Sequence, residues 1–425
     1  MAPTELSTNP ADSKDVGPTS NRSRQHKIEL TLFLVSFVFS AAAFFALDYS
    51  YSIVTSRPSP SSGATTGCGV PDPVRHHAFK PNCASIEYWG GDSYQFFSNS
   101  LGFRDEKIRE VPLADARPRI LILGDSYAEG KLAWRNSFVG RIAGHFPQYD
   151  FLNGGRDGYS PSNFLNTTRM VLAKGVDIDE VIVFLDNSTI GQEAAFYRDI
   201  DASGAVAGPE RQGSAASRRV KWQRLYGRHF VLTSDSIRLL DRLRPFLVRH
   251  GHYHLRALDF GDPFDMEMSA WTYRKVNESD PFPAGYAPLG VEGGIAKGKA
   301  KMTLLWEELE KRNIPISVVV NPHLAQLAHD TAESREVRIW RDWCQGKCKR
   351  FISVFPAFFA VKDECPRLEP GCWYPKLFTF GDVHFSSAGN ALVADAVIKS
   401  LEKDPPAKRP GTNLRAESGP GLGAH

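Results

Sequence analysis

The sequence has little net charge and few potential sulfur ligands. Its 51 Lys and Arg residues and 48 Asp and Glu residues leave a formal charge of only +3 over 425 residues. This balance argues against a chain that wraps nucleic acid, because such chains carry a large basic excess. No glycine-rich phosphate loop follows a strand in the right context, and no basic and aromatic RNA-binding signature occurs, so we expect neither a nucleotide nor a nucleic acid as partner. The composition also excludes collagen, coiled coils and wholesale disorder.

Charge is missing entirely from one long stretch near the N-terminus. Leu30–Leu47 contains eighteen consecutive uncharged residues, and a helix of that length nearly spans a hydrocarbon core of about 30 Å. Basic residues precede the stretch and Asp48 follows it, so the positive-inside rule places the N-terminus in the cytoplasm. We therefore expect a cytoplasmic tail over 1–27 and a transmembrane signal-anchor helix over 28–49, with the bilayer as partner. A cleavable signal peptide with Ala41–Ala43 as its cleavage site is the alternative.

Cysteine is scarce and confined to one side of this stretch. All six cysteines lie C-terminal to it, which agrees with an oxidising, extracytoplasmic location, either the periplasm or the cell surface. Closeness in sequence suggests three disulfides, although six cysteines allow many pairings: Cys68–Cys83, Cys344–Cys348 and Cys365–Cys372. A zinc site formed by the last four cysteines is the alternative, but their spacing matches no zinc ribbon, and we expect neither a metal nor another cofactor.

Short apolar runs alternate with helix-like stretches from about residue 116 onward, the pattern of parallel strands joined by crossover helices. The runs lack period-two alternation, as expected for strands that helices cover on both faces. We therefore predict a three-layer α/β/α sandwich around a five-stranded parallel sheet. The predicted strands are Arg119–Leu123, Tyr149–Asn153, Glu180–Leu185, Ile314–Val320 and Arg350–Phe355.

The segment between the third and fourth predicted strands is far longer than a simple crossover. It covers roughly 120 residues, about 191–310, whereas a crossover needs only about 10–20. We interpret it as a long helical insertion, a subdomain or lid. Arg211–Arg256 carries eleven Lys and Arg residues against two Asp, and we expect Arg218, Arg219 and Arg224 to contact an acidic glycan or anionic lipid headgroup. A solvated basic helix face explains the same residues equally well.

Composition also suggests the boundaries of the remaining segments. A stretch rich in Pro and Ser indicates an extracytoplasmic stalk and linker over 50–89. The folded domain is expected over 90–403, and a disordered tail over 404–425.

The sharpest chemical feature is a serine at the end of the first predicted strand. That strand runs directly into Gly124-Asp125-Ser126 and then into a helix-like segment. A serine at such a turn projects its hydroxyl from the carboxyl edge of the sheet, and the helix N-terminus offers N–H groups and a positive dipole where an oxyanion would form. Ser126 is therefore a candidate nucleophile. Simple capping of the helix by Asp125 and Ser126 is the alternative.

A second feature lies near the C-terminus. Asp382 and His384 precede an amphipathic helix, so they lie on a loop, where residues two apart can touch. Asp382 can accept the Nδ1–H of His384 and so fix the tautomer whose Nε2 takes the proton of Ser126. This arrangement favours a Ser–His–Asp catalytic triad.

Two further patches leave predicted strands at the same edge of the sheet. Asn153–Ser160 follows the second strand and is rich in glycine, which permits close backbone approach, so the N–H groups of Gly158 and Ser126 are the expected oxyanion donors. Val320–Gln326 follows the fourth strand. Because open α/β sheets bind ligands at this edge, His323 is a candidate substrate contact, although a turn around a proline explains the same patch.

In chain order these blocks resemble those of the SGNH, or GDSL-type, esterase superfamily. Gly124-Asp125-Ser126 is similar to the nucleophile block, Asn153–Gly158 to the glycine block and Asp382-Val383-His384 to the terminal block. Asn99–Arg104 resembles a segment found before the nucleophile in membrane-anchored members. The resemblance covers about residues 90–403 and implies a flavodoxin-like sheet, a serine nucleophile, and hydrolysis or transfer of acyl groups on lipids, glycans or small esters.

The chain departs from the family pattern at two places. The family usually supplies an oxyanion-donating asparagine after the third strand, where this chain has Ser188, with Asn187 one residue earlier as the expected third donor. Loss of one donor typically costs about 3–4 kcal/mol of transition-state stabilisation, which slows a reaction without abolishing it. The Asp-x-His spacing is also shorter than in many relatives and is shared with an acetyltransferase branch, which keeps acyl transfer open.

Three functions remain open from the sequence. The first is a membrane-anchored, extracytoplasmic serine esterase that cleaves acetyl or other short-chain esters of a glycan or lipid through an acyl-enzyme. The second is an O-acyltransferase that passes the same acyl group to a cell-surface polysaccharide. The third is a catalytically weak glycan- or envelope-binding module, supported only by the missing asparagine. No sequence feature separates water from a sugar as acyl acceptor or indicates the oligomeric state.

Overall fold

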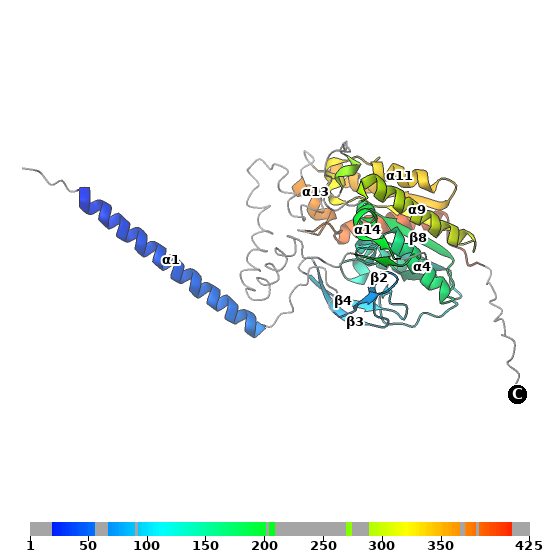
Figure 1. The fold of residues 1–425 in the computed structure, drawn as a ribbon, viewed down its shortest axis with the longest axis horizontal. Coiled ribbons are helices and arrows are strands. Elements are labelled where there is room, and N and C mark those ends of the chain that lie inside the picture. Colours follow the sequence, from blue (N-terminus) through cyan, green and yellow to red (C-terminus); the bar gives the residue numbers. More distant parts are fainter. Residues whose placement is uncertain are drawn as a thin grey trace, which may run out of the picture. The chain divides into compact units, whose positions relative to one another are not determined.

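The computed structural model describes residues 19–55, 67–89, 92–200, 204–208, 269–273, 289–365, 370–379 and 382–409 (Figure 1). The expected substrate contacts Arg218, Arg219 and Arg224 lie outside these residues, as does most of the expected insertion, so both stay predictions. The chain divides into two units, one with helix α1 and one with the α/β domain, and each is described by itself.

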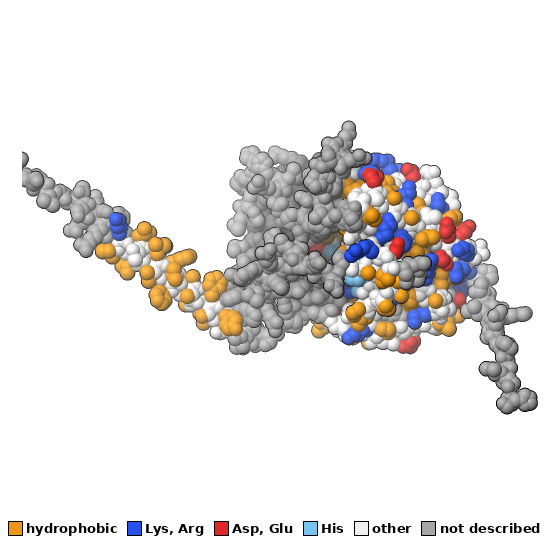
Figure 2. Space-filling view, in the orientation of Figure 1, with side chains coloured by type: hydrophobic (Ala, Val, Ile, Leu, Met, Phe, Trp, Pro, Cys, Tyr) orange, Lys and Arg blue, Asp and Glu red, His pale blue; other side chains and the backbone are white. Residues whose placement is uncertain are grey.

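Helix α1 (Thr19–Thr55) is one continuous helix (Figure 1). Its segment Lys27–Tyr51 has a mean hydropathy of 2.4 and is long and apolar enough to cross a membrane, by length and composition alone. Hydrophobic side chains cover its visible face in Figure 2, and Leu34, Phe37 and Phe39 are exposed. An exposed apolar helix near the N-terminus fits the expected membrane segment over 28–49, either as an anchor or as a signal.

A single, mostly parallel sheet organises the α/β domain, with strands in the order β12-β11-β8-β6-β7-β5-β4-β3. The neighbours β12, β11, β8, β6 and β7 pair in parallel, each with the next. The chain enters this part at β6, next to its edge strand β7, and adds one strand on one side of β6 and three on the other, which is the flavodoxin-like order. The five parallel strands agree with the predicted ones to within two residues at each end: β6 (Arg119–Leu123), β7 (Asp150–Asn153), β8 (Glu180–Leu185), β11 (Ile316–Val320) and β12 (Cys348–Ser353).

Helices cover both faces of the parallel strands, and alternate residues of β6 enter opposite cores. Leu121 and Leu123 pack in one core, and Ile120 and Ile122 in the other. The helices of the first core are α4 (Pro161–Ala173), α9 (Gly290–Glu310) and α11 (Arg335–Cys344). Those of the second are α3 (Phe138–His145), α10 (Leu324–His329), α12 (Phe355–Asp363), α13 (Pro370–Leu377) and α14 (Ser387–Lys403). Burial of both faces explains the uninterrupted apolar runs in the sequence.

The sheet has eight strands, so the prediction of five was wrong. The three further strands are antiparallel and extend the sheet beyond β7: β3 (Ala84–Trp89), β4 (Asp92–Ser98) and β5 (Arg104–Asp105). Their burial alternates, with Tyr94 and Phe96 buried and the intervening Gln95 exposed. Such alternation belongs to a sheet with one covered face, and a search for continuous apolar runs does not detect it.

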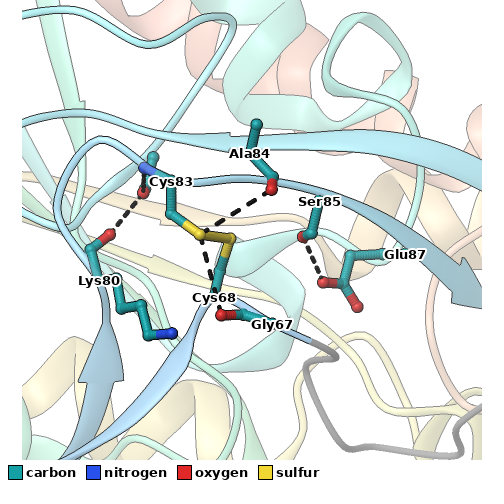
Figure 3. Close-up of a disulfide and its surroundings, with 8 residues drawn as sticks. Gly67, Cys68, Lys80, Cys83, Ala84, Ser85 and Glu87 are labelled. Carbon is teal, nitrogen blue, oxygen red and sulfur yellow. Dashed lines mark hydrogen bonds between the residues drawn. A yellow bond between two sulfur atoms is a disulfide. The ribbon is translucent and has the colours of Figure 1, made fainter.

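Part of the expected stalk and linker over 50–89 is folded. Residues from Gly67 onward form the hairpin β1 (Gly69–Asp72) and β2 (His76–Phe79), followed by β3. The disulfide Cys68–Cys83 ties the hairpin to the start of β3 (Figure 3), and Cys68 packs with Phe79 and Phe96. This small core of sulfur and aromatic groups, rather than a long apolar run, orders the segment.

The other two disulfides join the remaining cysteines as expected, Cys344 with Cys348 and Cys365 with Cys372. The described part of the chain has no free cysteine. Because disulfide sulfurs are not thiolates, these four cysteines do not provide the ligands that a zinc site would need.

The predicted range of the insertion, about 191–310, extends too far toward the C-terminus, because it includes helix α9 (Gly290–Glu310). Helix α9 packs on α4 and leads into β11, so it is the crossover helix of the sheet. Before it, the described residues form α5 (Asn187–Gly191), the π-helical turn η2 (Gln192–Phe196), the strands β9 (Arg198–Asp199) and β10 (Val206–Ala207), and the 3₁₀ turn η4 (Ala270–Thr272). The remaining short elements of the domain are α2 (Ser126–Glu129) and the 3₁₀ turn η1 (Trp134–Asn136).

The predicted start of the disordered tail, at residue 404 of 404–425, is too early in the chain. Residues 404–409 lie along the domain, where Lys408 Nζ is 3.0 Å from Asp179 Oδ2 and the backbone N–H of Arg409 donates to Asp179 Oδ1 at 2.9 Å. Asp179 is buried, so these contacts give its carboxylate the partners that burial requires.

Candidate active site

The turn that carries Ser126 follows directly from the buried strand β6 (Arg119–Leu123). Asp125 caps α2 by accepting the backbone N–H of Tyr127 at 2.9 Å, and Ser126 is the first residue of that helix. Gly124 makes the turn possible, because a Cβ there would lie 2.5 Å from the Cβ of Ala128. Arg104, which belongs to the block before the nucleophile, donates to the backbone oxygens of Glu129, Gly130 and Leu132 and so fixes the end of α2.

The structure brings Ser126, His384 and Asp382 together in one hydrogen-bonded chain. Ser126 Oγ lies 2.8 Å from His384 Nε2, and His384 Nδ1 lies 2.5 Å from Asp382 Oδ1. The same carboxylate oxygen accepts the backbone N–H of His384 at 2.8 Å. Because an ionised carboxylate only accepts, Nδ1 carries the proton and Nε2 is free to accept the hydroxyl proton of Ser126.

The electrostatics of this chain favour a basic imidazole. Burial alone would lower the pKa of His384, but the charge of Asp382 and its hydrogen bond outweigh burial and raise that pKa above its ordinary value. Burial likewise opposes ionisation of Asp382, yet the neighbouring imidazole holds the pKa of this carboxyl below its usual range. Asp382 therefore stays ionised and stabilises the imidazolium that proton transfer would create.

Two aromatic rings contact the His384 imidazole. The Tyr127 ring is 5.1 Å away and tilted, and the Trp89 ring stands edge-on at 5.0 Å. The Tyr127 hydroxyl also donates to the carbonyl of Val383 at 2.8 Å, which ties the His384 loop to the nucleophile helix. Trp89 comes from the antiparallel strand β3, and the sequence analysis missed it because that strand was taken for a linker.

A buried ionic cluster lies beside the triad. Glu129 contacts Lys131 at 2.7 Å and Arg156 at 2.7 Å, and Lys131 contacts Asp157 at 3.1 Å. Burial would raise the pKa of Glu129, but the two cations hold it far below its usual range. The cluster acts on the triad electrostatically in two opposite ways, because the charge of Lys131 lowers the pKa of His384 and the charge of Asp157 raises it. The sequence analysis did not single out Glu129 or Lys131, although both follow the nucleophile block closely.

Gly158 occupies a tight turn next to the nucleophile. The turn closes through the backbone N–H of Tyr159, which donates to the Arg156 carbonyl at 2.9 Å, and Gly158 has φ 75°. Gly155 approaches α2 so closely that a Cβ there would lie 2.6 Å from the Cβ of Ala128. Glycine at both positions therefore lets the turn lie directly against the nucleophile helix, as the sequence predicts.

Asn187 and its neighbours follow β8 at the same edge of the sheet. Asn187 is fully buried, and among the described residues neither its Oδ1 nor its Nδ2 has a hydrogen-bond partner. No hydrogen bond in the described part of the chain links it to Ser126. Ser188, which stands at the family's asparagine position, instead donates to Asp125 Oδ2 at 2.9 Å. Burial, followed by the charge of Asp186, raises the pKa of Asp125 well above its ordinary value.

His323 lies at the start of α10 and is buried. Its Nδ1 is 2.9 Å from Ser269 Oγ, and its backbone N–H donates to Gln326 Oε1 at 2.8 Å. Burial lowers the pKa of His323 to about 4, so the imidazole is neutral near pH 7. The charges of Asp382 and His384 also act on this pKa, which places His323 near the triad, while contact with substrate stays a prediction.

The described residues contain no group of three or more His, Cys, Asp or Glu side chains that could hold a metal ion.

The comparisons with known proteins found similarity only at the level of structure. No family model matches the sequence, and no curated protein is significantly similar to it. Solved structures that resemble the chain include a putative acylhydrolase from Bacteroides fragilis, with 11% identity, 69% of this chain and 91% of that chain covered, and a TM-score of 0.33. A member of the lipolytic G-D-S-L family from Veillonella parvula has 10% identity, covers 67% and 98%, and has a TM-score of 0.35. A psychrotrophic esterase from Pseudoalteromonas sp. has 10% identity, covers 67% and 97%, and has a TM-score of 0.31.

Proposed function

We propose that the protein is a serine esterase that cleaves ester bonds through an acyl-enzyme. The observation that carries this proposal is the continuous hydrogen-bonded chain from Ser126 Oγ through His384 to Asp382. A helix cap alone would explain Ser126 but not an imidazole at 2.8 Å from its hydroxyl with a partly buried carboxylate behind it.

In the proposed reaction, Ser126 Oγ attacks the ester carbonyl while His384 Nε2 takes the hydroxyl proton. Asp382 stabilises the resulting imidazolium, and the N–H groups of Ser126 and Gly158 hold the negative oxygen of the tetrahedral intermediate. His384 then returns the proton to the leaving alcohol, and the acyl group stays on Ser126. Water, deprotonated by His384, attacks this acyl-enzyme and releases the acid, which restores the serine hydroxyl.

The substrate of this proposal is an acetyl or other short-chain ester on an extracytoplasmic glycan or lipid. The apolar helix α1 and three disulfides support a membrane-anchored domain in an oxidising compartment. The basic residues before Leu30 support a cytoplasmic N-terminus, so the catalytic domain would act in the periplasm or at the cell surface.

Hydrolysis of a short-chain aryl ester by the full-length protein tests the proposal. Ser126→Ala should reduce kcat at least about 10³-fold, because the nucleophile is lost while binding and the oxyanion donors remain. Ser387→Ala is the matched control, since the hydroxyl of this exposed serine accepts a hydrogen bond from Arg141 at 2.9 Å on the surface, and its loss should leave kcat unchanged. Near-wild-type hydrolysis by Ser126→Ala would refute the proposed nucleophile.

A further inference from the structure

The hydrogen bond that closes the turn at Gly158 does not by itself determine the orientation of the turn's central peptide. It has the geometry of a type II turn, with Tyr159 N–H on the Arg156 carbonyl and φ 75° at Gly158. Type I and type II turns close with the same hydrogen bond and differ mainly in which way the central peptide faces. The peptide between Asp157 and Gly158 therefore needs an outside partner to hold the Gly158 N–H in one direction.

The structure supplies that partner from the β1–β2 hairpin. His77 Nε2 lies 2.7 Å from the carbonyl oxygen of Asp157. A carbonyl only accepts, so His77 Nε2 carries the proton and donates it. In a trans peptide the N–H points away from the C=O, so a carbonyl held toward His77 turns the Gly158 N–H to the opposite side.

The peptides on either side are held as well. Glu129 Oε2 accepts the backbone N–H of Asp157 at 2.7 Å, and the Tyr197 hydroxyl donates to the Gly158 carbonyl at 2.7 Å. The Gly158 N–H itself has no acceptor among the described residues. The three consecutive peptides from Arg156 to Tyr159 are therefore held in place, and the Gly158 N–H between them stays available to a ligand.

The loop also packs against the segment that carries Ser126. The backbone N–H of Arg156 donates to the carbonyl of Gly124, two residues before Ser126, at 3.1 Å, and the charge of Asp157 acts on His384. A Cβ at Gly155 would lie 2.6 Å from the Cβ of Ala128, two residues after Ser126, so the loop runs beside the turn that carries Ser126. This is the position in which an oxyanion donor is useful.

The hairpin is built to hold His77 in place. Tyr159 donates its hydroxyl to the His77 carbonyl at 2.6 Å, and the two rings meet edge-on at 5.1 Å. His77 Nδ1 lies 3.0 Å from His76 Nδ1. Burial, followed by the charge of Arg156, lowers the pKa of His77 to about 4, so a neutral imidazole can donate from Nε2 and accept at Nδ1 near pH 7.

We infer that His77 is a positioning residue for the proposed reaction: through the Asp157 carbonyl it turns the Gly158 N–H toward the oxyanion, with Tyr197 holding the next peptide. This inference rests on the proposed esterase function. It gives the N-terminal hairpin, which lies outside the α/β sheet, a role in the chemistry.

Steady-state kinetics of the full-length protein on a short-chain aryl ester test this inference. His77→Ala should lower kcat by roughly ten- to hundredfold with KM changed less than about twofold, because a misdirected N–H weakens the transition state and not substrate binding. His77→Gln keeps a side-chain N–H and should recover most of the loss. Thr303→Val is the control, because it removes a comparable hydrogen bond, from Trp343 Nε1 at 3.1 Å, between α9 and α11, and neither residue is part of the site.

A second variant keeps the test decisive if His77→Ala does not fold. Tyr197→Phe removes one oxygen from a buried ring and should lower kcat by about fivefold at unchanged KM, the effect of one lost hydrogen bond. A kcat within about twofold of wild type in a folded His77→Ala protein, or in Tyr197→Phe, would overturn the inference, as would a rise in KM at unchanged kcat. Ester hydrolysis that depends on Ser126 but not on His77 would refute the positioning role and leave the esterase proposal standing, whereas a wild-type protein without hydrolysis would refute both.

Discussion

At the scale of single residues, the hydrogen-bonded chain from Ser126 through His384 to Asp382 joins two segments that lie far apart in the sequence. Ser126 follows a buried strand, and Asp382 and His384 are close in sequence, so local chemistry was enough to suggest their roles. Trp89 and His77 escaped the sequence analysis because nothing local marks them. Each reaches the site only through strand pairing or hairpin packing, which are contacts between segments far apart in the chain.

The pH dependence follows from the charge pair behind Ser126. General-base catalysis needs neutral His384, so kcat/KM should rise with pH through the pKa of His384, which Asp382 raises above its ordinary value. Asp382→Asn removes that charge, and burial then lowers the pKa of His384. The rise should therefore move to lower pH while the plateau falls by up to about 10⁴-fold.

Rates measured from about pH 5 to about pH 9 on wild type and Asp382→Asn check this prediction. A rise that stays at the same pH in the variant would show that Asp382 does not set the pKa of His384.

At the scale of elements, the five parallel strands could be predicted because each is a continuous apolar run buried on both faces. The antiparallel strands β3 to β5 could not be found in this way, since only one of their faces is buried and the alternation is short. The hairpin β1–β2 depends on a disulfide and on Phe79 and Phe96, whose partnership is not visible in the sequence.

The Cys68–Cys83 disulfide should matter for catalysis as well as for stability. It closes a loop with a sequence separation of 15, and such a loop constrains the unfolded chain by about 3 kcal/mol. The double variant Cys68→Ala/Cys83→Ala should loosen the hairpin that holds His77, and so lower both kcat and the melting temperature.

The matched control is Cys344→Ala/Cys348→Ala, which removes a bridge between α11 and β12 with a sequence separation of 4. Its kcat should stay close to wild type. If the two double variants lose kcat equally, the hairpin has no special connection to the site.

At the scale of the whole molecule, the order of segments could be predicted but several boundaries could not. The hairpin that begins at Gly69 and residues 404–409 both belong to the described part of the domain, and they are held by one disulfide and a few polar contacts instead of an apolar pattern. The crossover helix α9 was assigned to the insertion because no strand signal separates it from the long segment before it.

The proposed anchor makes the full-length chain an integral membrane protein. After expression it should stay in the membrane fraction through an alkaline carbonate wash, with its N-terminal residues retained. A Leu34→Arg/Phe37→Arg variant should be released, because each charge at the centre of a spanning helix costs about 3 kcal/mol. Recovery of a soluble wild-type chain that begins shortly after Ala43 would contradict the anchor and support the signal-peptide alternative.

Covalent labelling with a fluorophosphonate probe tests the central claim most directly, because this reagent reacts with a serine only when a base and an oxyanion site activate it. The full-length protein is incubated with the probe, digested and analysed by mass spectrometry to locate the adduct. We predict one labelled residue, Ser126, with no label in Ser126→Ala and labelling slowed by about 10²-fold or more in His384→Ala. An unlabelled wild-type protein, or a label that persists in Ser126→Ala, would contradict the assignment of this site as a serine esterase.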